Sequence, residues 1–269
     1  MKLNLKKLAA VAGLASTLIL TGCGQEEANT NSIKVGVMAG AEAQVAEVAA
    51  KVAKEQYGLD VELVTFTDYV TPNAALDDGS IDLNAFQHKP YLDQQVTDRG
   101  YKIEIAGNSF VYPIAGYSKQ VTSVDQIEDG ARIAVPNDPT NLGRSLLLLQ
   151  EQGLITLRDG SGLAATVRDI TTNPKNITIV ELDAAQLPRS LDDVALSVIN
   201  TTYASSLNLT PEKDGIFVED KDSPYVNLIV GRTDNVNTEN VKTFVKAYQS
   251  EEVYQAALKT FKGGVVKGW

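Results

Sequence analysis

The chain has 269 residues, 43% of them hydrophobic and 22% charged, and a formal net charge of −10. This size and balance predict a globular body of one large domain or two lobes. The acidic charge argues against nucleic acid as a partner and against peripheral attraction to anionic lipid. Because the chain holds one His and one Cys, a zinc or copper site would need mainly carboxylate ligands, which is uncommon. We therefore expect neither a metal nor a cofactor.

The first 22 residues have the layout of an export signal. Three lysines precede an apolar run over residues 8–20, which is shorter than the ~20 residues that a membrane span needs. Leu20-Thr21-Gly22-Cys23 resembles a bacterial lipobox, and Cys23, the only cysteine, has no partner for a disulfide. We expect residues 1–22 to be a lipoprotein signal peptide and Cys23 to be lipidated. The alternative is an ordinary secretory signal followed by an accidental cysteine.

Residues 23–31 are expected to form a flexible tether behind the acylated cysteine, because the residues that follow it are mostly polar. Each buried methylene of an acyl chain contributes about 0.8 kcal/mol, so several chains hold a protein on a membrane better than one. The body beyond residue 22 has 247 residues and a net charge of −13, since the three lysines of the signal are lost. We expect a lipid-anchored protein of the cell membrane that faces the periplasm or the cell exterior.

From residue 32 the chain alternates strands with helices. Ile33, Val35 and Val37 alternate as a strand, and the apolar spacing that follows predicts a helix. Thr71 and Pro72 are typical of a helix N-cap and first helical position. The helices of this half are expected at 41–57, 71–79 and 90–99, and its further strands at 61–64, 81–86, 101–106 and 110–117.

The pattern of strand followed by helix starts again after residue 118. Residues 132–135 predict a strand, and Pro139 opens a helix that runs through four leucines and ends at Gly153. Thr238 is expected to cap a last helical region with one apolar face. The remaining strands of this half are expected at 177–182, 195–199, 215–218 and 225–231.

This alternation predicts an α/β fold with largely parallel sheets, and the restart predicts two lobes. We expect lobe I to comprise residues 32–116 and 226–269, and lobe II to comprise residues 117–225. The chain would cross between the lobes near 113–119 and 222–228 if the last strand and helices return to lobe I. That return is inferred from the fold type rather than from periodicity.

Aromatic residues and the only histidine gather at one expected strand end. Phe86, His88 and Tyr91 lie where a strand is followed by the helix that starts near Pro90, and Tyr69 follows the preceding strand. Ligands of open α/β sheets bind outside the carboxyl ends of the strands, where helix N-termini point. These residues therefore predict an apolar slot with one imidazole. The alternative is a loop histidine with structural aromatic neighbours.

A second candidate group lies at the strand end before the helix that Pro139 opens. Backbone N–H groups at a helix N-terminus favour an anion, and Arg144 can pair with a carboxylate through two hydrogen bonds. Asn141 belongs to the same segment. The segment has no Gly-x-x-x-x-Gly-Lys pattern, which excludes a phosphate loop of that type. The alternative is an exposed arginine on a capped helix.

Asn200 closes one expected strand and Asn227 lies within another. An asparagine side chain offers donors and an acceptor, which suits the ammonium and carboxylate groups of a zwitterion; a turn or cap role is the alternative. An aromatic slot, one fixed cation and several amides together suit an amino acid with an apolar side chain. The set lacks a nucleophile with its base and a paired acid and base, so we expect no catalytic residues and no enzyme.

Four segments resemble the NlpA lipoprotein family, the methionine-binding lipoproteins of bacterial methionine ABC importers. They are Phe-Gln-His-Lys-Pro-Tyr-Leu at 86–92, Asn-Asp-Pro-Thr-Asn-Leu-Gly-Arg at 137–144, Val-Ile-Asn-Thr-Thr-Tyr-Ala at 198–204 and Asp-Ser-Pro-Tyr-Val-Asn-Leu at 222–228. The resemblance covers essentially the whole chain. It implies a two-lobed, hinged periplasmic-binding-protein fold with the ligand in the cleft, and delivery of that ligand to an ABC permease with a cytoplasmic ATPase.

The resemblance also implies a role for each candidate residue. Arg144 would hold the α-carboxylate of L-methionine with support from Asn141, and Asn200 and Asn227 would bind its amino and carboxylate groups. The link at 190–195 before the Asn200 strand is shorter than the family leads us to expect. The residues implied around the thioether side chain are Tyr69, Phe86, His88 and Tyr91.

Two alternatives stay open at this stage. The slot could take D-methionine, a methionine derivative or another apolar amino acid, because one methylene changes discrimination by only about 1–3 kcal/mol. The chain could instead serve as a surface adhesin or a structural lipoprotein built on the same fold.

Overall fold

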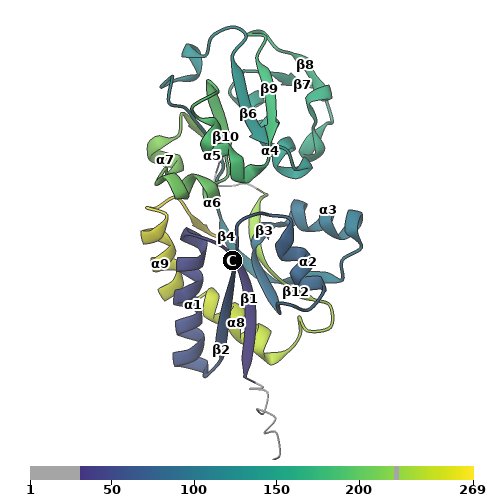
Figure 1. The fold of residues 1–269 in the computed structure, drawn as a ribbon, viewed down its shortest axis with the longest axis vertical. Helices are drawn as coiled ribbons and strands as arrows, with labels where there is room; N and C mark the ends of the chain where they lie inside the picture. The colour runs from purple at the N-terminus through teal and green to yellow at the C-terminus, as the bar shows by residue number, and fades with distance from the viewer. Residues whose placement is uncertain (1–30, 221–223) are drawn as a thin grey trace, which may run out of the picture. The chain divides into compact units, whose positions relative to one another are not determined.

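The computed structural model describes residues 31–220 and 224–269, so the expected signal peptide, Cys23 and most of the tether lie outside the described residues. Residues 31–269 form one compact unit. Within it, the described strands build two main sheets, each flanked by helices (Figure 1). We use lobe I for the part built on the six-stranded sheet and lobe II for the part built on the five-stranded sheet.

Lobe I contains the first four of the described strands and the last two. The strand order of its sheet is β13-β4-β12-β3-β1-β2. Its strands are β1 (Ser32–Met38), β2 (Asp60–Phe66), β3 (Leu83–His88), β4 (Ile103–Val111), β12 (Val226–Arg232) and β13 (Val266–Lys267). Its helices are α1 (Ala41–Tyr57), α2 (Thr71–Asp77), α3 (Lys89–Arg99), α8 (Glu239–Tyr248) and α9 (Glu251–Thr260).

Lobe II is built from the middle of the chain, and its main sheet has the order β11-β5-β10-β6-β9. The strands of this lobe are β5 (Ala115–Tyr117), β6 (Arg132–Pro136), β7 (Thr156–Leu157), β8 (Ile170–Thr172), β9 (Thr178–Leu182), β10 (Leu196–Ile199) and β11 (Phe217–Val218). Its α-helices are α4 (Pro139–Glu151), α5 (Leu187–Ser190), α6 (Thr201–Ala204) and α7 (Pro211–Asp214). Its 3₁₀ turns are η1 (Val124–Gln126), η2 (Gly162–Ala164), η3 (Val167–Asp169), η4 (Ala184–Gln186) and η5 (Ser205–Leu207).

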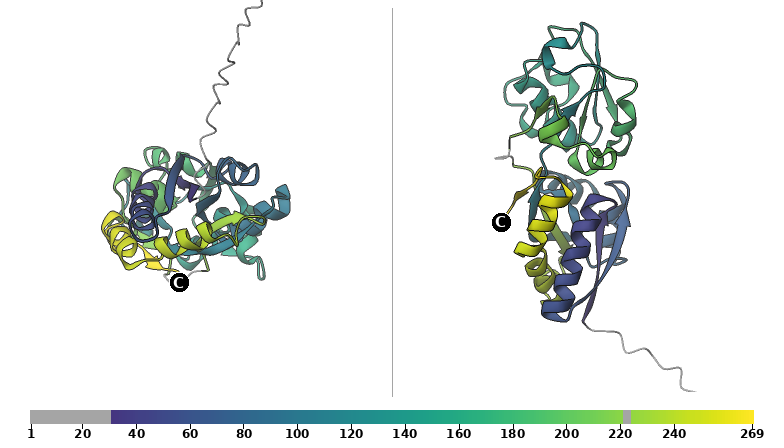
Figure 2. Two further views of the ribbon diagram at one scale, coloured as in Figure 1. Left: turned by 90° about the horizontal axis from the view of Figure 1, so that it is seen from below. Right: turned by 90° about the vertical axis from the view of Figure 1, so that its left-hand side faces the viewer.

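The core of lobe I lies on both faces of its sheet. α1 packs against α8 and α9 on one face, as the lower lobe shows in the right view of Figure 2, around Val45, Phe244 and Ala257. Leu76 of α2 and Leu92 of α3 belong to a separate apolar cluster with residues of β12. Because β3 lies between β12 and β1 and all its residues are buried, the strand that ends at His88 is held rigidly.

Both sheets are more mixed than the sequence predicts. β1 pairs in parallel with β2 and β3, but β12 pairs antiparallel with both β3 and β4. In lobe II, β6 pairs in parallel with β9 and β10, whereas β5 pairs antiparallel with β10 and β11. The antiparallel strands β4, β5, β11 and β12 flank the interlobe crossings, and the last strand, β13, also pairs antiparallel with β4. The α/β fold and its two lobes are confirmed.

The strands expected at 101–106 and 110–117 differ from those in the structure. Residues 103–111 form the single strand β4. The expected strand at 110–117 is wrong as one element, because β4 ends at Val111 and β5 of the other sheet begins at Ala115. Gly107 is needed for packing and not for a turn, because an added Cβ would lie 2.7 Å from Val245 of α8. The strand ends before Pro113, which has no N–H for a ladder hydrogen bond.

The chain crosses between the two sheets at two places. The first crossing, residues 112–114, connects β4 to β5, and the second lies between Val218 of β11 and Val226 of β12. Ala115 and Gly116, which the expected boundary assigns to lobe I, pair within the lobe II sheet. In the described part of the chain, none of the helices is both long and apolar enough to span a bilayer.

Candidate functional site

A cavity lies between the two lobes. All eight candidate residues line this one cavity: Tyr69, Phe86, His88, Tyr91, Asn141, Arg144, Asn200 and Asn227. The lining residues that sequence reasoning did not single out are Gln87, Tyr112, Thr201 and Thr202.

The lobe I wall of the cavity is aromatic. Tyr69, Phe86 and Tyr91 form a cluster in which the ring centroids lie 5.8 to 6.3 Å apart, and Met38 packs against them. The Tyr91 hydroxyl donates a 2.7 Å hydrogen bond to the backbone carbonyl of Tyr69, which fixes the two rings relative to each other. Tyr69 lies in the segment after β2, Phe86 lies near the end of β3 and Tyr91 lies in the first turn of α3. The wall therefore offers flat apolar surface with little freedom to move.

His88 ends β3 and caps α3, and its ring reaches the other lobe. Its Nδ1 accepts a 3.2 Å hydrogen bond from the backbone N–H of Tyr91, so the proton of a neutral ring is assigned to Nε2. Nε2 then donates to the Asn141 Oδ1 in lobe II at 3.2 Å. Burial, assisted by the nearby Arg144 cation, lowers the pKa of His88 to about 3. The imidazole is therefore neutral at physiological pH.

The lobe II wall is polar and is organised by the start of α4. Asp138 caps this helix by accepting from the backbone N–H of Asn141 at 2.9 Å, and it also accepts from the Asn141 amide group. The Asn141 Oδ1 accepts a 2.9 Å hydrogen bond from Asn200 Nδ2 in addition to the one from His88. The Asn200 Oδ1 is buried and has no hydrogen-bond partner in the described part of the chain.

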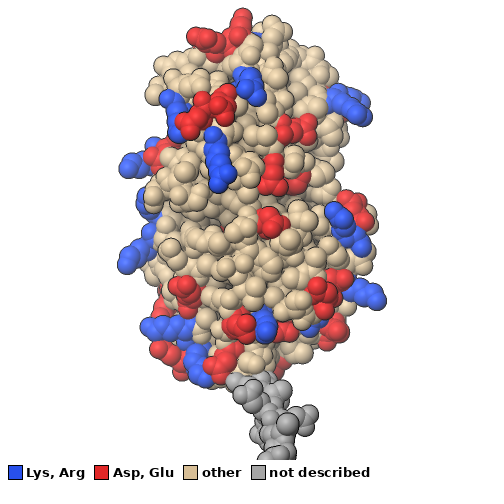
Figure 3. Space-filling view, viewed as in Figure 1, with Lys and Arg blue, Asp and Glu red and all other residues tan. Residues whose placement is uncertain are grey.

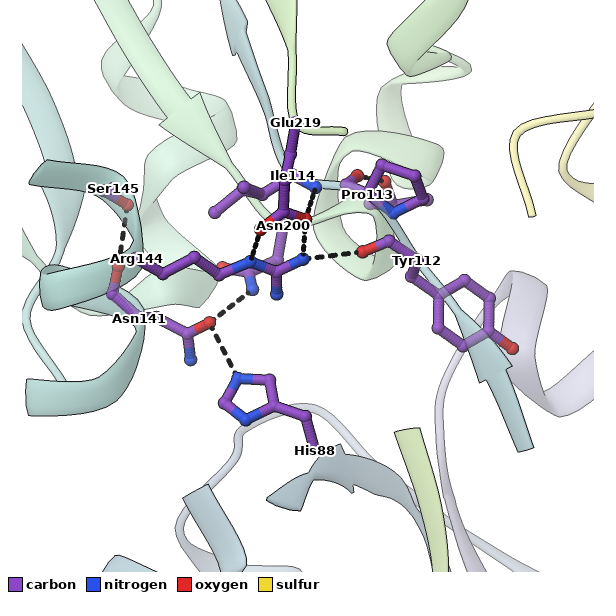
Figure 4. Close-up of polar contacts among 10 residues, drawn as sticks. His88, Tyr112, Pro113, Ile114, Asn141, Arg144, Ser145, Asn200 and Glu219 are labelled. Atoms are coloured by element: carbon purple, nitrogen blue, oxygen red, sulfur yellow. Dashed lines mark hydrogen bonds and ion pairs between the residues drawn. The ribbon is translucent and has the colours of Figure 1, made fainter. Parts of the chain in front are cut away.

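Arg144 is 4% exposed and is held by groups from both crossings (Figure 4). Its Nε donates to Glu219 Oε1 at 2.8 Å and its Nη2 contacts Glu219 Oε2, while Nη2 also donates to the backbone carbonyl of Tyr112 at 3.0 Å. The guanidinium carbon lies 4.3 Å from the ring centroid of Tyr225. Among the described residues, nothing hydrogen-bonds Nη1. The arginine is therefore fixed on two sides with one donor group to spare.

Glu219 is the principal residue that sequence reasoning missed. It follows the two-residue strand β11 on the second crossing, and its backbone N–H donates to Ile114 on the first crossing at 2.9 Å. Nothing in the local sequence distinguishes Glu219 from the other acidic residues around it. Arg144 could have indicated such a residue. A buried cation needs a counter-charge when no ligand is bound, so an acidic partner for Arg144 was to be expected.

Asn227 lies on β12 directly opposite His88 of β3. Its Nδ2 donates a 2.9 Å hydrogen bond to the backbone carbonyl of Phe86, so one function of this side chain is to brace the aromatic wall. The nearby Gln87 belongs to a buried amide network with Asn73 and Asn84. This network ties β3 to α2 and keeps the strand end in register.

Charges on the outer surface do not form a single-sign field on the face that Figure 3 shows. Basic and acidic side chains alternate over both lobes there, and a continuous basic area is absent from that face. In the described part of the chain, no group of three or more His, Cys, Asp and Glu side chains is arranged to hold a metal ion. The chemistry of the cavity is therefore that of aromatic rings, one arginine and several amides.

Comparisons with known proteins agree with this geometry. Residues 33–269 match the model of the NlpA lipoprotein family. The chain is 75% identical over 269 residues, which cover all of both chains, to a protein of Vibrio cholerae named as a probable D-methionine-binding lipoprotein MetQ.

Two solved structures are also similar. A nutrient-binding protein from Burkholderia cenocepacia bound to methionine is 53% identical, with a TM-score of 0.86 over 88% of this chain and 100% of that chain. An ABC transporter periplasmic substrate-binding protein from Coxiella burnetii is 49% identical, with a TM-score of 0.86 over the same shares of the two chains. These relatives are named as binding proteins, and none of the three as an enzyme.

Proposed function

Because the chain belongs to the NlpA lipoprotein family, we propose that its interlobe cavity captures L-methionine and that the protein delivers it to an ABC import permease with a cytoplasmic ATPase. The observation that carries this proposal is the division of the cavity. An aromatic wall lies in lobe I, and spare hydrogen-bonding groups, Arg144 Nη1 and Asn200 Oδ1, lie in lobe II. An apolar amino acid is divided in the same way, with an apolar side chain at one end and the charged ammonium and carboxylate groups at the other.

The thioether side chain lies against the aromatic wall in this proposal. Phe86, Tyr69 and Tyr91 present ring faces and edges from three directions, and a sulfur atom near an aromatic ring gains about 0.3–1.5 kcal/mol per contact. Because the rings are fixed by packing and by the Tyr91 hydrogen bond, little ordering cost remains for binding.

The charged groups of the ligand lie at the lobe II wall. Arg144 Nη1 donates to the α-carboxylate, and the buried Asn200 Oδ1 accepts from the ammonium group, which gives this otherwise unpartnered acceptor a donor. Asn141 and Asn227 complete the surroundings. Arg144 and Glu219 form an ion pair within the site, so the site carries little net charge of its own and suits a zwitterion.

Stereochemical preference follows from three points of attachment: the aromatic wall, Arg144 and Asn200. Exchange of the hydrogen and the ammonium group at Cα would move the ammonium away from Asn200. We propose L-methionine as the preferred ligand. D-methionine, which the name of the Vibrio cholerae relative indicates for that protein, is the main alternative, followed by methionine derivatives and other apolar amino acids.

Capture couples to closure of the two lobes about the connections between their sheets. Contacts that join the lobes include His88 to Asn141 at 3.2 Å and the Tyr203 hydroxyl to the Thr67 carbonyl at 3.3 Å. A ligand that touches both walls stabilises the closed form relative to the open form. The closed form then docks on the permease. Acyl chains on Cys23 keep the protein at the membrane, on the periplasmic or outer side.

Calorimetric titration of L-methionine, D-methionine and norleucine into protein that has been unfolded and refolded to remove carried-over ligand tests the binding step. We expect one-to-one binding of L-methionine with a micromolar or tighter Kd, at least ~8 kcal/mol. A folded sample that binds none of the three contradicts the proposal. Methionine uptake in cells that lack the protein tests delivery, because a surface adhesin or structural lipoprotein would leave uptake unchanged.

A further inference from the structure

A buried carboxyl group joins the two lobes beside the cavity without lining it. Glu42 lies in the first turn of α1 in lobe I and is 2% exposed. Its Oε1 accepts a 2.5 Å hydrogen bond from the hydroxyl of Thr202, which belongs to α6 of lobe II. The binding scheme above gives this side chain no role, although burial of an acid is costly.

The surroundings of Glu42 are phenolic rather than cationic. The charge of Glu42 raises the pKa of tyrosines from four parts of the chain. They are Tyr69 after β2, Tyr112 on the first crossing, Tyr203 of α6 and Tyr248 of α8. Burial, opposed only by the Thr202 hydrogen bond, raises the pKa of Glu42 to about 8. The carboxyl group in this closed arrangement is therefore mostly protonated at neutral pH.

Thr202 connects this carboxyl group to the binding cavity. It lines the cavity together with Tyr69, a member of the aromatic wall. The hydrogen bond from Thr202 to Glu42 is therefore a link between lobe II and lobe I beside that wall. Separation of the lobes breaks this link and removes Thr202 and Tyr203 from the Glu42 carboxyl, which admits water to it.

We propose that Glu42 is a positioning residue for ligand capture, and that closure of the lobes over the ligand takes up one proton from solvent onto its carboxylate. The balance is simple: the ionised carboxylate of the open form and one proton give the neutral carboxyl group of the closed form. This proposal rests on the proposed function, because it requires a ligand-driven closure of the cavity.

The open and closed forms differ in the pKa of Glu42, and this difference sets the direction in which methionine affinity changes with pH. Entry of water on opening would return the pKa of Glu42 toward its ordinary value of 4.5, whereas burial in the closed form raises the pKa to about 8. Below pH 4.5 both forms are protonated and the affinity does not depend on this group. Between the two values the open form is ionised and the closed form is not, so affinity falls as pH rises, by up to about tenfold per pH unit.

His88 titrates in the opposite direction and must be separated from Glu42. Its ordinary pKa of 6.5 in the open form is lowered to about 3 by burial in the closed form, so below pH 6.5 closure releases a proton. The two effects oppose each other between pH 4.5 and 6.5. Above pH 6.5 the Glu42 effect remains, and the tyrosines around it have raised pKa values that lie above this range. Between pH 6.5 and 8 the Glu42 effect is therefore the larger of the two, and Glu42→Gln reports what remains of the His88 effect.

Calorimetry of L-methionine binding in two buffers with different ionisation enthalpies tests the proposal. At pH 7.3 we expect the purified protein to take up about 0.7 proton per ligand bound, and its Kd to rise about tenfold between pH 6.5 and 8. Glu42→Gln keeps the shape and the acceptor for Thr202 but cannot titrate. We expect this variant to bind methionine without proton uptake and with a Kd that stays level or falls slightly across this range.

Thr202→Val is the matched control, because it removes the interlobe hydrogen bond and leaves the carboxyl group buried. We expect weaker binding with proton uptake retained. An infrared difference spectrum of the unmodified protein should show the C=O stretch of a protonated carboxyl group on ligand addition, and this signal needs no variant. Methionine binding with no proton uptake, or with equal uptake in Glu42→Gln, overturns this proposal alone. Absence of methionine binding instead contradicts the proposed function.

Discussion

The two walls of the cavity are built in opposite ways. In lobe I the aromatic side chains satisfy one another and the neighbouring backbone, as in the contact between Tyr91 and Tyr69. In lobe II the polar side chains are organised, yet Arg144 Nη1 and Asn200 Oδ1 are left without a hydrogen-bond partner among the described residues. The lobe I wall presents a fixed apolar surface, whereas the lobe II wall presents polar atoms that are still able to form hydrogen bonds with a ligand. Most of the binding energy that depends on a single residue should therefore lie in lobe II.

The largest effect is expected for Arg144→Ala. Removal of the guanidinium leaves the ligand carboxylate and Glu219 without their cation, and truncation of one partner of a buried charged pair costs about 2–5 kcal/mol. Calorimetric titration of L-methionine should show this loss. Arg132→Ala is the control, because Arg132 is exposed and starts β6 away from the cavity. Unchanged methionine affinity in Arg144→Ala would show that this arginine does not hold the ligand.

Glu219→Gln should have a smaller effect, mainly on the ligand-free protein. The variant keeps the shape of the side chain but leaves Arg144 without a counter-charge, at a cost of about 1–3 kcal/mol of unfolding free energy. Urea unfolding without and with methionine measures this change. Because the ligand carboxylate compensates part of the missing charge, added methionine should recover part of the loss. Glu181→Gln, at an exposed position of β9, should alter neither curve; an equal loss with and without ligand would argue against this reading of Glu219.

Phe86→Leu should have the smallest effect on methionine affinity. It tests whether the lobe I wall contributes aromatic contacts with sulfur in addition to apolar surface. Leucine keeps the wall apolar but removes one aromatic contact with sulfur, which is worth about 0.3–1.5 kcal/mol. Norleucine has a methylene in place of the sulfur and should lose less than methionine. Parallel titrations of the two ligands measure the difference. An equal loss for both would mean that Phe86 contributes only shape.

The sequence was sufficient for the features that depend on local patterns. The helix at Ala41–Tyr57 follows from its apolar spacing. Gly58 ends it with a φ of 70°, a left-handed backbone conformation that glycine adopts readily. The candidate residues could be located because polar and aromatic side chains at strand ends of an α/β sheet meet at one edge. All of them line the cavity, while their roles toward a ligand remain predictions.

The features that sequence reasoning missed depend on contacts between distant segments. Glu219 meets Arg144 across 75 residues, and Glu42 meets Thr202 across 160. Neither acid stands in a pattern that distinguishes it from solvated surface acids. The continuity of β4 was missed for a related reason, because Gly107 reflects the close approach of Val245 rather than a turn. The lipidation of Cys23 and the bounds of the signal peptide lie outside the described residues.

The two walls of the cavity should bind opposite ends of one amino acid. A crystal of the protein grown with L-selenomethionine as the ligand, and with ordinary methionine in the chain, shows the orientation of the ligand, because anomalous scattering locates the selenium atom. We predict one strong ligand peak among Tyr69, Phe86 and Tyr91, with the ligand carboxylate at Arg144. A selenium peak at the Arg144 side of the cavity, or outside it, would contradict the account.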